Sequence, residues 1–219
     1  MQKAATPGRK PSDTSVDKLS TAAGTTPERI LAAGRALFQD RGYERTSMSE
    51  IANRVGISAP SVYWHFKSKE EILYSILRSG LTDFYNALST GPEGTPPTER
   101  LSRLVISYVR FQLDQLDNTT GFMNIYGLAQ LGHALTTEHL EDLRRVERQV
   151  LALFETILSD GLEKNVFVLD DVAVTAFSLI TMCENVTTWA KPDGRLSPSQ
   201  IAGLLSRLAC RMVTSAAEN

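Results

Sequence analysis

The chain has 219 residues, of which 42% are hydrophobic and 22% are charged, and its formal net charge is −2 at pH 7. This length is sufficient to bury a sizeable core, and the overall charge excludes a uniformly basic nucleic-acid-binding protein. The charge is asymmetric, because residues 1–75 carry 11 Lys/Arg and 8 Asp/Glu (+3), whereas residues 76–219 carry 12 and 17 (−5). The basic excess therefore lies in the N-terminal part of the chain.

The cysteine content favours a reducing compartment, and the hydropathy pattern argues against secretion and membrane insertion. Cys183 and Cys210 lie in apolar helical surroundings without partners at metal-ligand spacing, and we interpret both as buried free thiols. The chain has no apolar core typical of a signal peptide and no run of ~18 apolar residues. We expect a soluble cytoplasmic protein without a membrane partner.

The first ordered element is predicted after residue 25. Residues 1–25 are rich in Ser, Thr, Pro, Ala and Gly, carry scattered basic side chains and have no apolar period, which is typical of a disordered arm. This basic arm either follows a DNA backbone or is simply solvated. Thr26 as a cap, Pro27 at the first helical position and Glu28 near the positive helix end then predict a helix that stops at Gly42. Its buried face is predicted to contain Ile30, Leu31, Gly34, Leu37 and Phe38.

Residues 48–66 predict two short helices joined by a tight turn. Gly56 permits the left-handed residue that ends the first helix, Ser58 can cap the second, and Pro60 is tolerated in its first turn. This is the pattern of a helix-turn-helix, whose second helix would be the recognition helix of a DNA-binding domain. The apolar positions that define the pattern are Ile51, Val55, Ile57, Val62 and Phe66.

The rest of the chain is also predicted to be helical. Ser47 with Glu50 and Ser68 with Glu71 have the spacing of capping boxes at two helix starts. A helix over residues 69–88 carries a wide apolar stripe and is long enough to join a small head to a larger body. A loop rich in Gly and Pro follows, and no stretch alternates with period two for long enough to form a sheet. The predicted fold class is all-α, with about nine helices; those of the body are expected over residues 98–117, 121–131, 137–165, 170–190 and 198–217.

Many positions across residues 26–75 agree with one known arrangement in order and spacing. They are Leu37-Phe38, Gly42-Tyr43, Thr46-Ser47, Ile51-Ala52, Gly56-Ile57-Ser58, Val62-Tyr63, His65-Phe66 and Ser68-Lys69-Glu70. This pattern resembles the TetR family of bacterial regulators. The resemblance implies an all-α homodimer with a helix-turn-helix DNA-binding domain over residues 26–72 and an effector-binding and dimerisation domain over residues 73–219.

The recognition helix is similar to that of the tetracycline repressor, which implies operator contacts from its exposed side chains. Tyr63 and Lys67 suit phosphates, Ser61 suits base edges, and Trp64 either contacts DNA or packs at the edge of the head. Ser49 and Ala59 stand where that repressor has base-reading Arg and Gln, so a different operator is expected. The full predicted DNA-binding set is Ser47, Ser49, Ser58, Ala59, Pro60, Ser61, Tyr63, Trp64, His65, Lys67 and Lys69.

Bulky apolar groups in the body are candidates for the wall of an effector cavity of the kind that the resemblance implies. Taken alone, each of them is better explained as a core residue, because bulky apolar side chains mostly fill protein interiors. Glu184 and Asn185 interrupt an apolar helix, and a buried polar group requires a partner, which a ligand could supply. The predicted effector pocket comprises Tyr108, Phe111, Phe122, Met123, Tyr126, His133, Phe154, Met182, Glu184, Asn185 and Trp189.

Two further features of the C-terminal part bear on partners. Residues 189–197 resemble a linker found in family members that respond to acyl-coenzyme A thioesters, which favours an acyl-CoA effector with Lys191, Arg195 and Arg211 as phosphate partners or as a solvated surface. Apolar residues at three-and-four spacing predict a dimer interface, unless one stripe faces its own core. The predicted interface comprises Phe177, Ile180, Thr181, Ile201, Leu204, Leu205 and Leu208.

These observations favour a ligand-responsive DNA-binding repressor that is released from its operator by a small hydrophobic effector. An activator, or an architectural DNA binder without effector, remains the alternative. An enzyme is not expected, because the histidines at positions 65, 133 and 139 are scattered and no nucleophile elbow, phosphate loop or His-Glu-x-x-His motif occurs. No cofactor and no metal are predicted.

Overall fold

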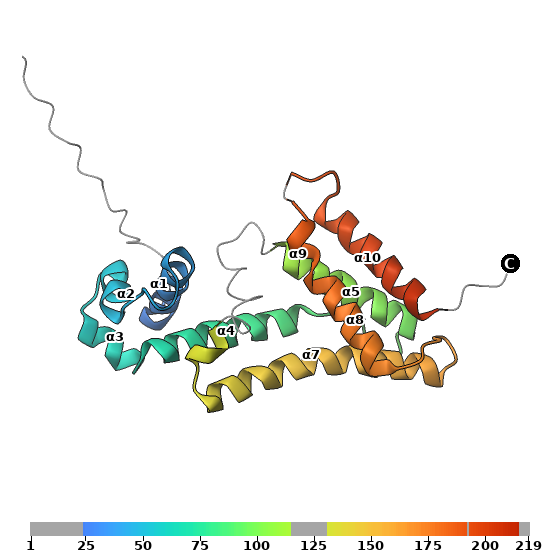
Figure 1. The fold of residues 1–219 in the computed structure, drawn as a ribbon, viewed down its shortest axis with the longest axis horizontal. Helices are drawn as coiled ribbons and strands as arrows, with labels where there is room; N and C mark the ends of the chain where they lie inside the picture. Colours follow the sequence, from blue (N-terminus) through green and yellow to red (C-terminus); the bar gives the residue numbers. More distant parts are fainter. Residues whose placement is uncertain (1–23, 115–130, 192, 215–219) are drawn as a thin grey trace, which may run out of the picture.

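A computed structural model describes residues 24–114, 131–191 and 193–214, and the regular structure in these ranges is helical, which confirms the all-α fold class. The predicted helix over residues 121–131 lies almost wholly outside the described residues. Helices α1 to α3 form a head at one end, α4 runs from the head into the body, and α7 lies beside it (Figure 1). The elements are α1 Thr26–Arg41, α2 Met48–Val55, α3 Ala59–His65, α4 Lys69–Ala87, α5 Pro97–Asp114, the 3₁₀ helix η1 Gly132–Ala134, α7 Thr137–Glu163, α8 Val172–Glu184, α9 Val186–Trp189 and α10 Pro198–Val213.

The helix starts follow side-chain capping, with two corrections to the sequence prediction. The cap of α1 is Thr25 and not Thr26, because the Glu28 carboxylate accepts from the Thr25 backbone N–H at 2.8 Å. Ser68 caps α4 as predicted, but the Glu71 carboxylate accepts from the Lys67 N–H and therefore bonds one residue before the cap. The capping box predicted for Ser47 at the start of α2 is confirmed.

Two hydrophobic cores hold the molecule together. The head core collects side chains from α1 to α4, and it also buries Leu143 of α7 completely. The body core forms where α5, α7, α8 and α10 pack together, with α10 lying mainly on α5. The head core extends beyond residue 72, since Ile76 and Leu77 of α4 belong to it. One helix thus contributes to both the head and the body.

The predicted helix over residues 170–190 is broken into α8 and α9. The break falls at Asn185, whose side-chain amide and backbone N–H both donate to the Thr181 carbonyl, at 2.9 and 3.0 Å. Cys183 and Cys210 are free thiols; burial raises the pKa of Cys183 to about 12, whereas Cys210 is only partly buried. No helix in the described part of the chain has the length and apolar character needed to cross a bilayer.

Candidate DNA-binding head and effector pocket

The helix-turn-helix is held by backbone geometry and by one brace from α1. Gly56 adopts φ 79° and ψ 32°, the left-handed conformation that ends α2 and turns the chain toward α3. The Arg29 guanidinium donates to the Val55 carbonyl at 2.8 Å, which satisfies an acceptor at the end of α2. Val62 is fully buried in the head core. These contacts fix one face of α3 and leave the other open.

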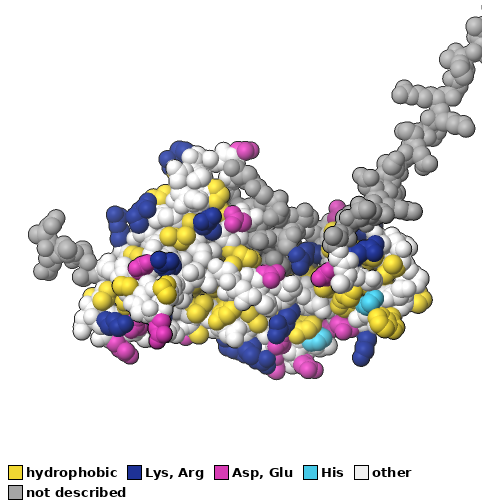
Figure 2. All heavy atoms as spheres, turned by 180° about the vertical axis from the view of Figure 1, so that it is seen from behind, with side chains coloured by type: hydrophobic (Ala, Val, Ile, Leu, Met, Phe, Trp, Pro, Cys, Tyr) yellow, Lys and Arg dark blue, Asp and Glu magenta, His cyan; other side chains and the backbone are white. Residues whose placement is uncertain are grey.

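The open face of α3 carries part of the predicted DNA-binding set, and the other members lie on α2, on α4 or in the adjoining turns. Trp64 has 82% of its surface exposed, so it does not pack at the edge of the head. Its ring lies edge-to-face against the His65 ring, with the ring centres 4.8 Å apart. None of the predicted contact residues is buried. On the face of the molecule shown in Figure 2, basic and acidic side chains are interspersed. The predicted contact residues are therefore accessible to DNA in this structure.

Some predicted DNA ligands already have intramolecular partners. The Ser58 and Ser61 hydroxyls lie 2.7 Å apart, and the Ser47 hydroxyl accepts from the Glu50 N–H. The Lys69 ammonium donates to the Tyr43 carbonyl at 2.8 Å and lies 4.1 Å from the centre of the Tyr43 ring. Lys69 therefore ties α4 to the start of the α1–α2 loop, a role that its position in the sequence did not indicate. Its contact with phosphate stays a prediction.

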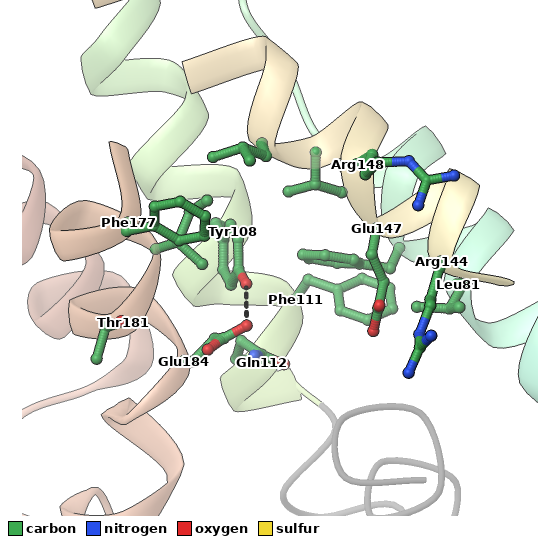
Figure 3. Close-up of a pocket in the computed structure, with 14 residues that line it drawn as sticks. Leu81, Tyr108, Phe111, Gln112, Arg144, Glu147, Arg148, Phe177, Thr181 and Glu184 are labelled. Carbon is green, nitrogen blue, oxygen red and sulfur yellow. Dashed lines mark hydrogen bonds between the residues drawn. The ribbon is translucent and has the colours of Figure 1, made fainter. Parts of the chain in front are cut away.

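A cavity of about 490 Å³ lies between α4, α5, α7 and α8 (Figure 3). Its volume is within the range of sites that hold small organic ligands. Its walls are largely apolar and aromatic, while charged side chains come from α7 and from the end of α8. The lining residues are Leu81, Phe84, Tyr108, Phe111, Gln112, Arg144, Glu147, Arg148, Val150, Leu151, Phe177, Ile180, Thr181 and Glu184.

Three polar groups of the cavity have raised pKa values. The Tyr108 hydroxyl donates to Glu184 Oε1 at 3.2 Å, and burial raises the pKa of Tyr108 well above its ordinary value (Figure 3). Desolvation at the cavity also raises the pKa of Glu184 and of Glu147, although both residues as a whole are exposed, and the negative charge of Glu184 raises the pKa of Glu147 further. Arg144 and Arg148 are exposed on α7 beside these carboxyl groups. The cavity thus combines an apolar interior with carboxyl groups and guanidinium groups.

Comparison with known proteins identifies the family. Residues 30–76 match the model of "Bacterial regulatory proteins, tetR family", and residues 94–213 match that of "Tetracyclin repressor-like, C-terminal domain". The chain belongs to the TetR family. This TetR-family protein is 26% identical over 191 residues to the transcriptional repressor KstR2 of Mycobacterium tuberculosis, covering 85% of this chain and 92% of KstR2.

Solved structures of TetR-family regulators have the same fold. A tetR-family regulatory protein from Rhodococcus RHA1 superposes with a TM-score of 0.76 at 27% identity, covering 88% of this chain and 99% of that one. AibR in complex with isovaleryl coenzyme A and operator DNA gives a TM-score of 0.71 at 27% identity, covering 83% and 96%. The head of this TetR-family protein is accordingly a DNA-binding helix-turn-helix.

The cavity of this TetR-family protein includes only part of the predicted effector pocket. Tyr108, Phe111 and Glu184 line the cavity, and their contact with an effector stays a prediction. Phe154 is instead buried in the body core and Met182 packs against that core. Of the other predicted pocket residues, His133, Asn185 and Trp189 are exposed and lie outside the cavity walls. Phe122, Met123 and Tyr126 lie outside the described residues.

The cavity residues that the sequence interpretation missed come mainly from α4 and α7. Arg144, Glu147 and Arg148 lie in a charged run that is typical of a solvated helix face. Leu81 and Phe84 belong to the wide apolar stripe of the helix that was predicted to join head and body. Leu143, Val150 and Phe154 recur at helical spacing among these charged residues, and this pattern indicates that α7 has a buried side.

The residues of the predicted dimer interface include an exposed group and a group that is buried in the body core. Phe177 of α8 and Leu204 and Leu208 of α10 are exposed, forming apolar stripes without a partner in the described chain. Ile201 and Leu205 are instead buried in the body core, so the own-core alternative holds for these two. Phe177, Ile180 and Thr181 line the cavity. Cavity and stripe therefore lie on adjacent faces of α8.

Replacing Glu184 with glutamine is expected to stabilise the ligand-free protein near neutral pH, because burial raises the pKa of this carboxyl group. A raised pKa in the folded state gives stability that is present below the unfolded pKa and is lost as the pH rises through the folded pKa. The gain in Tm should therefore be present at about pH 7 and vanish toward about pH 4, below the ordinary pKa of a glutamate.

Thermal unfolding of wild type and Glu184→Gln across this pH range measures the effect. Glu141→Gln, on α7 outside the cavity walls, is the control and should give no pH-dependent gain. A Glu184→Gln variant with a lower Tm near neutral pH would show that the bond from Tyr108 outweighs the cost of burial.

Proposed function

We propose that the protein is a dimeric cytoplasmic transcriptional repressor that leaves its operator when an acyl-CoA thioester occupies the cavity between α4, α5, α7 and α8. One observation carries this proposal. Leu81 and Phe84 of α4 line the cavity, and the same helix begins at Lys69, four residues after the recognition helix ends at His65. A ligand in the cavity therefore touches the helix that carries the head.

The cavity favours a ligand with an apolar body and an anionic group. An acyl chain suits the aromatic and aliphatic walls, and the guanidinium groups of Arg144 and Arg148 suit the phosphates of a nucleotide. Arg195 and Arg211 are exposed and lie outside the cavity walls, so we assign the phosphate role to the arginines of α7. The structural relative AibR, solved with isovaleryl coenzyme A and operator DNA, supports this ligand class.

The exposed stripes of α8 and α10 support a homodimer. Val174 and Phe177 of α8 and Leu204, Leu208 and Met212 of α10 are large apolar side chains left in contact with solvent. Two such helices from each subunit would bury them in a four-helix bundle with two-fold symmetry. A dimer presents two recognition helices to two half-sites, and this compensates for the lack of bidentate base-reading side chains on α3.

The proposal predicts that a thioester, and not its fragments, weakens operator binding. Fluorescence polarisation with a labelled fragment of the DNA upstream of the protein's own gene measures the affinity, in the presence of isovaleryl-CoA, palmitoyl-CoA, free coenzyme A or isovalerate. At least one thioester should weaken binding by about tenfold or more, which is a typical allosteric coupling.

A matched pair of variants tests the assignment of the phosphate partner. Arg148→Met should raise the thioester concentration needed for release by about tenfold, since it removes a charge-assisted bond, whereas Arg103→Met on α5 should leave it unchanged. Tight DNA binding that no thioester weakens would instead support an architectural DNA binder, and activation of transcription in vitro by the bound protein would support an activator.

A further inference from the structure

A cluster of polar and aromatic side chains joins α4 to α7 between the head and the cavity. The Tyr74 hydroxyl donates to Asp142 Oδ2 at 3.0 Å, and the Arg78 guanidinium donates to the same oxygen. The His139 ring stacks on the Tyr74 ring at 3.8 Å with an interplanar angle of 6°, and its Nδ1 lies 2.7 Å from Glu70 Oε1. We call these five residues the α4–α7 clamp.

The clamp has more than one bond at each anchoring carboxylate. The second oxygen of Asp142 accepts from Arg145 at 3.0 Å, and the Glu70 carboxylate also accepts from the Thr136 N–H at the start of α7 at 3.1 Å. Charge-assisted bonds that share a carboxylate give geometric specificity as well as attraction. The relative position of α4 and α7 is therefore fixed by side chains from both helices.

The clamp lies between the two regions that a regulator has to connect. On α4, Leu73 and Ile76 belong to the head core, whereas Leu81 lines the cavity. On α7, Leu143 is fully buried in the head core, whereas Arg144, the next residue, lines the cavity. Each of these helices thus contacts the head core, the clamp and the cavity within a few turns.

The other ion pairs in the described ranges do not make this connection. Arg41 pairs with Glu50 inside the head, and Arg100 of α5 pairs with Asp160 of α7 inside the body. In these ranges Arg78–Asp142 is the ion pair that joins α4 to the body, and the His139 ring forms a hydrogen bond with Glu70 beside it. The contacts that hold the head to the body by charge are therefore concentrated in the clamp.

We propose that the α4–α7 clamp holds the recognition helix at one position relative to the body, and that a change at the cavity reaches the head through it. Tyr74 and Asp142 are then positioning residues for operator binding. The regulatory part of this inference rests on the proposed function. A dimer binds two half-sites only when both heads are correctly spaced, and a head that moves freely lowers the apparent affinity by the fraction of time it is misplaced.

Asp142→Asn tests the clamp, because it keeps the shape of the side chain and removes the charge that Arg78 and Tyr74 share. Arg100→Met is the matched control, since it removes an ion pair between α7 and α5 that lies away from the head. We expect Asp142→Asn to weaken operator binding by about tenfold and the control to leave it unchanged. Tyr74→Phe, which retains the ring that stacks on His139, should change the affinity in the same direction by less.

Pulsed electron paramagnetic resonance measures the position of the head without DNA or ligand. Spin labels at Asn53→Cys in α2 and Gln149→Cys in α7, both exposed, report the distance from head to body in a Cys210→Ser background, with labelled chains diluted into unlabelled protein. The wild type should give a narrow distance distribution, Asp142→Asn a broad or shifted one, and Arg100→Met the wild-type one.

The two measurements separate the failure of the clamp from the failure of the proposed function. Equal distance distributions in wild type and in both clamp variants would overturn the clamp, whatever the DNA affinity. If the wild type binds no operator but the head of Asp142→Asn is mobile in the distance measurement, the proposed function is overturned and the clamp remains in place. If Asp142→Asn fails to fold, as judged by circular dichroism, Tyr74→Phe decides the result.

Discussion

Replacing Ser61 with glutamate is expected to abolish operator binding while leaving the head folded. Ser61 is exposed and occupies the third helical position after the Ser58 cap, where a glutamate would form with Ser58 a capping box like the one that Ser47 and Glu50 form at α2. The same carboxylate would face the phosphates and the base acceptors of the operator, and like charges across an interface cost several kcal/mol. We expect a loss of affinity on the order of 100-fold with an unchanged or raised Tm.

The control for Ser61→Glu is Gln200→Glu, which places the same charge at the same position of another capped helix. Gln200 is the third residue after the Ser197 cap of α10 and forms a capping box there. This variant has the same net charge as Ser61→Glu, so equal loss of DNA binding by both would show a general charge effect. Retained binding by Ser61→Glu would contradict the assignment of α3 as the recognition helix.

Replacing Gly161 with alanine is expected to destabilise the body by about 2 kcal/mol, because its methyl group would overlap the ring of Phe167. Gly161 lies in the last turn of α7, and its carbonyl accepts from the N–H groups of Val166 and Phe167 as the chain turns back. The buried Phe167 ring cannot move without opening the body core. The higher helix propensity of alanine offsets only about 0.5–1 kcal/mol of this overlap.

Thermal unfolding should show a decrease in Tm of roughly 5 °C for Gly161→Ala. A double-mutant cycle with Phe167→Leu identifies the cause, since the smaller side chain leaves room for the added methyl group. Gly161→Ala should then cost less in the Phe167→Leu background than in the wild type. Additive effects of the two substitutions would exclude the predicted overlap.

The head could be predicted from the sequence because its signals are local. The Ser47 cap, the left-handed Gly56 and the buried Val62 lie within sixteen residues, and each has one interpretation that fits the others. Helix boundaries shifted by only one residue where two candidates compete, as at Thr25 and Thr26, because either hydroxyl can act as a cap and only the folded turn selects one.

The cavity was harder to predict from the sequence, because its walls depend on packing between helices that are distant in the chain. Phe154 and Phe111 are both apolar aromatic residues on body helices, yet the first is buried in the core and the second lines the cavity. The carboxylate of Asp142 does not indicate by itself that Tyr74, 68 residues earlier, donates to it. Periodicity identifies the buried face of a helix but not the helix that it meets.

The affinity of the purified protein for the DNA upstream of its own gene, measured over a series of salt concentrations, tests the central claim most directly. A repressor with a helix-turn-helix head should bind this DNA more tightly than a scrambled fragment of the same length. The logarithm of its affinity should fall linearly with the logarithm of the salt concentration as phosphate contacts are lost. Equal affinity for both fragments, or no binding at low salt, would contradict the assignment of residues 48–66 as an operator-reading element.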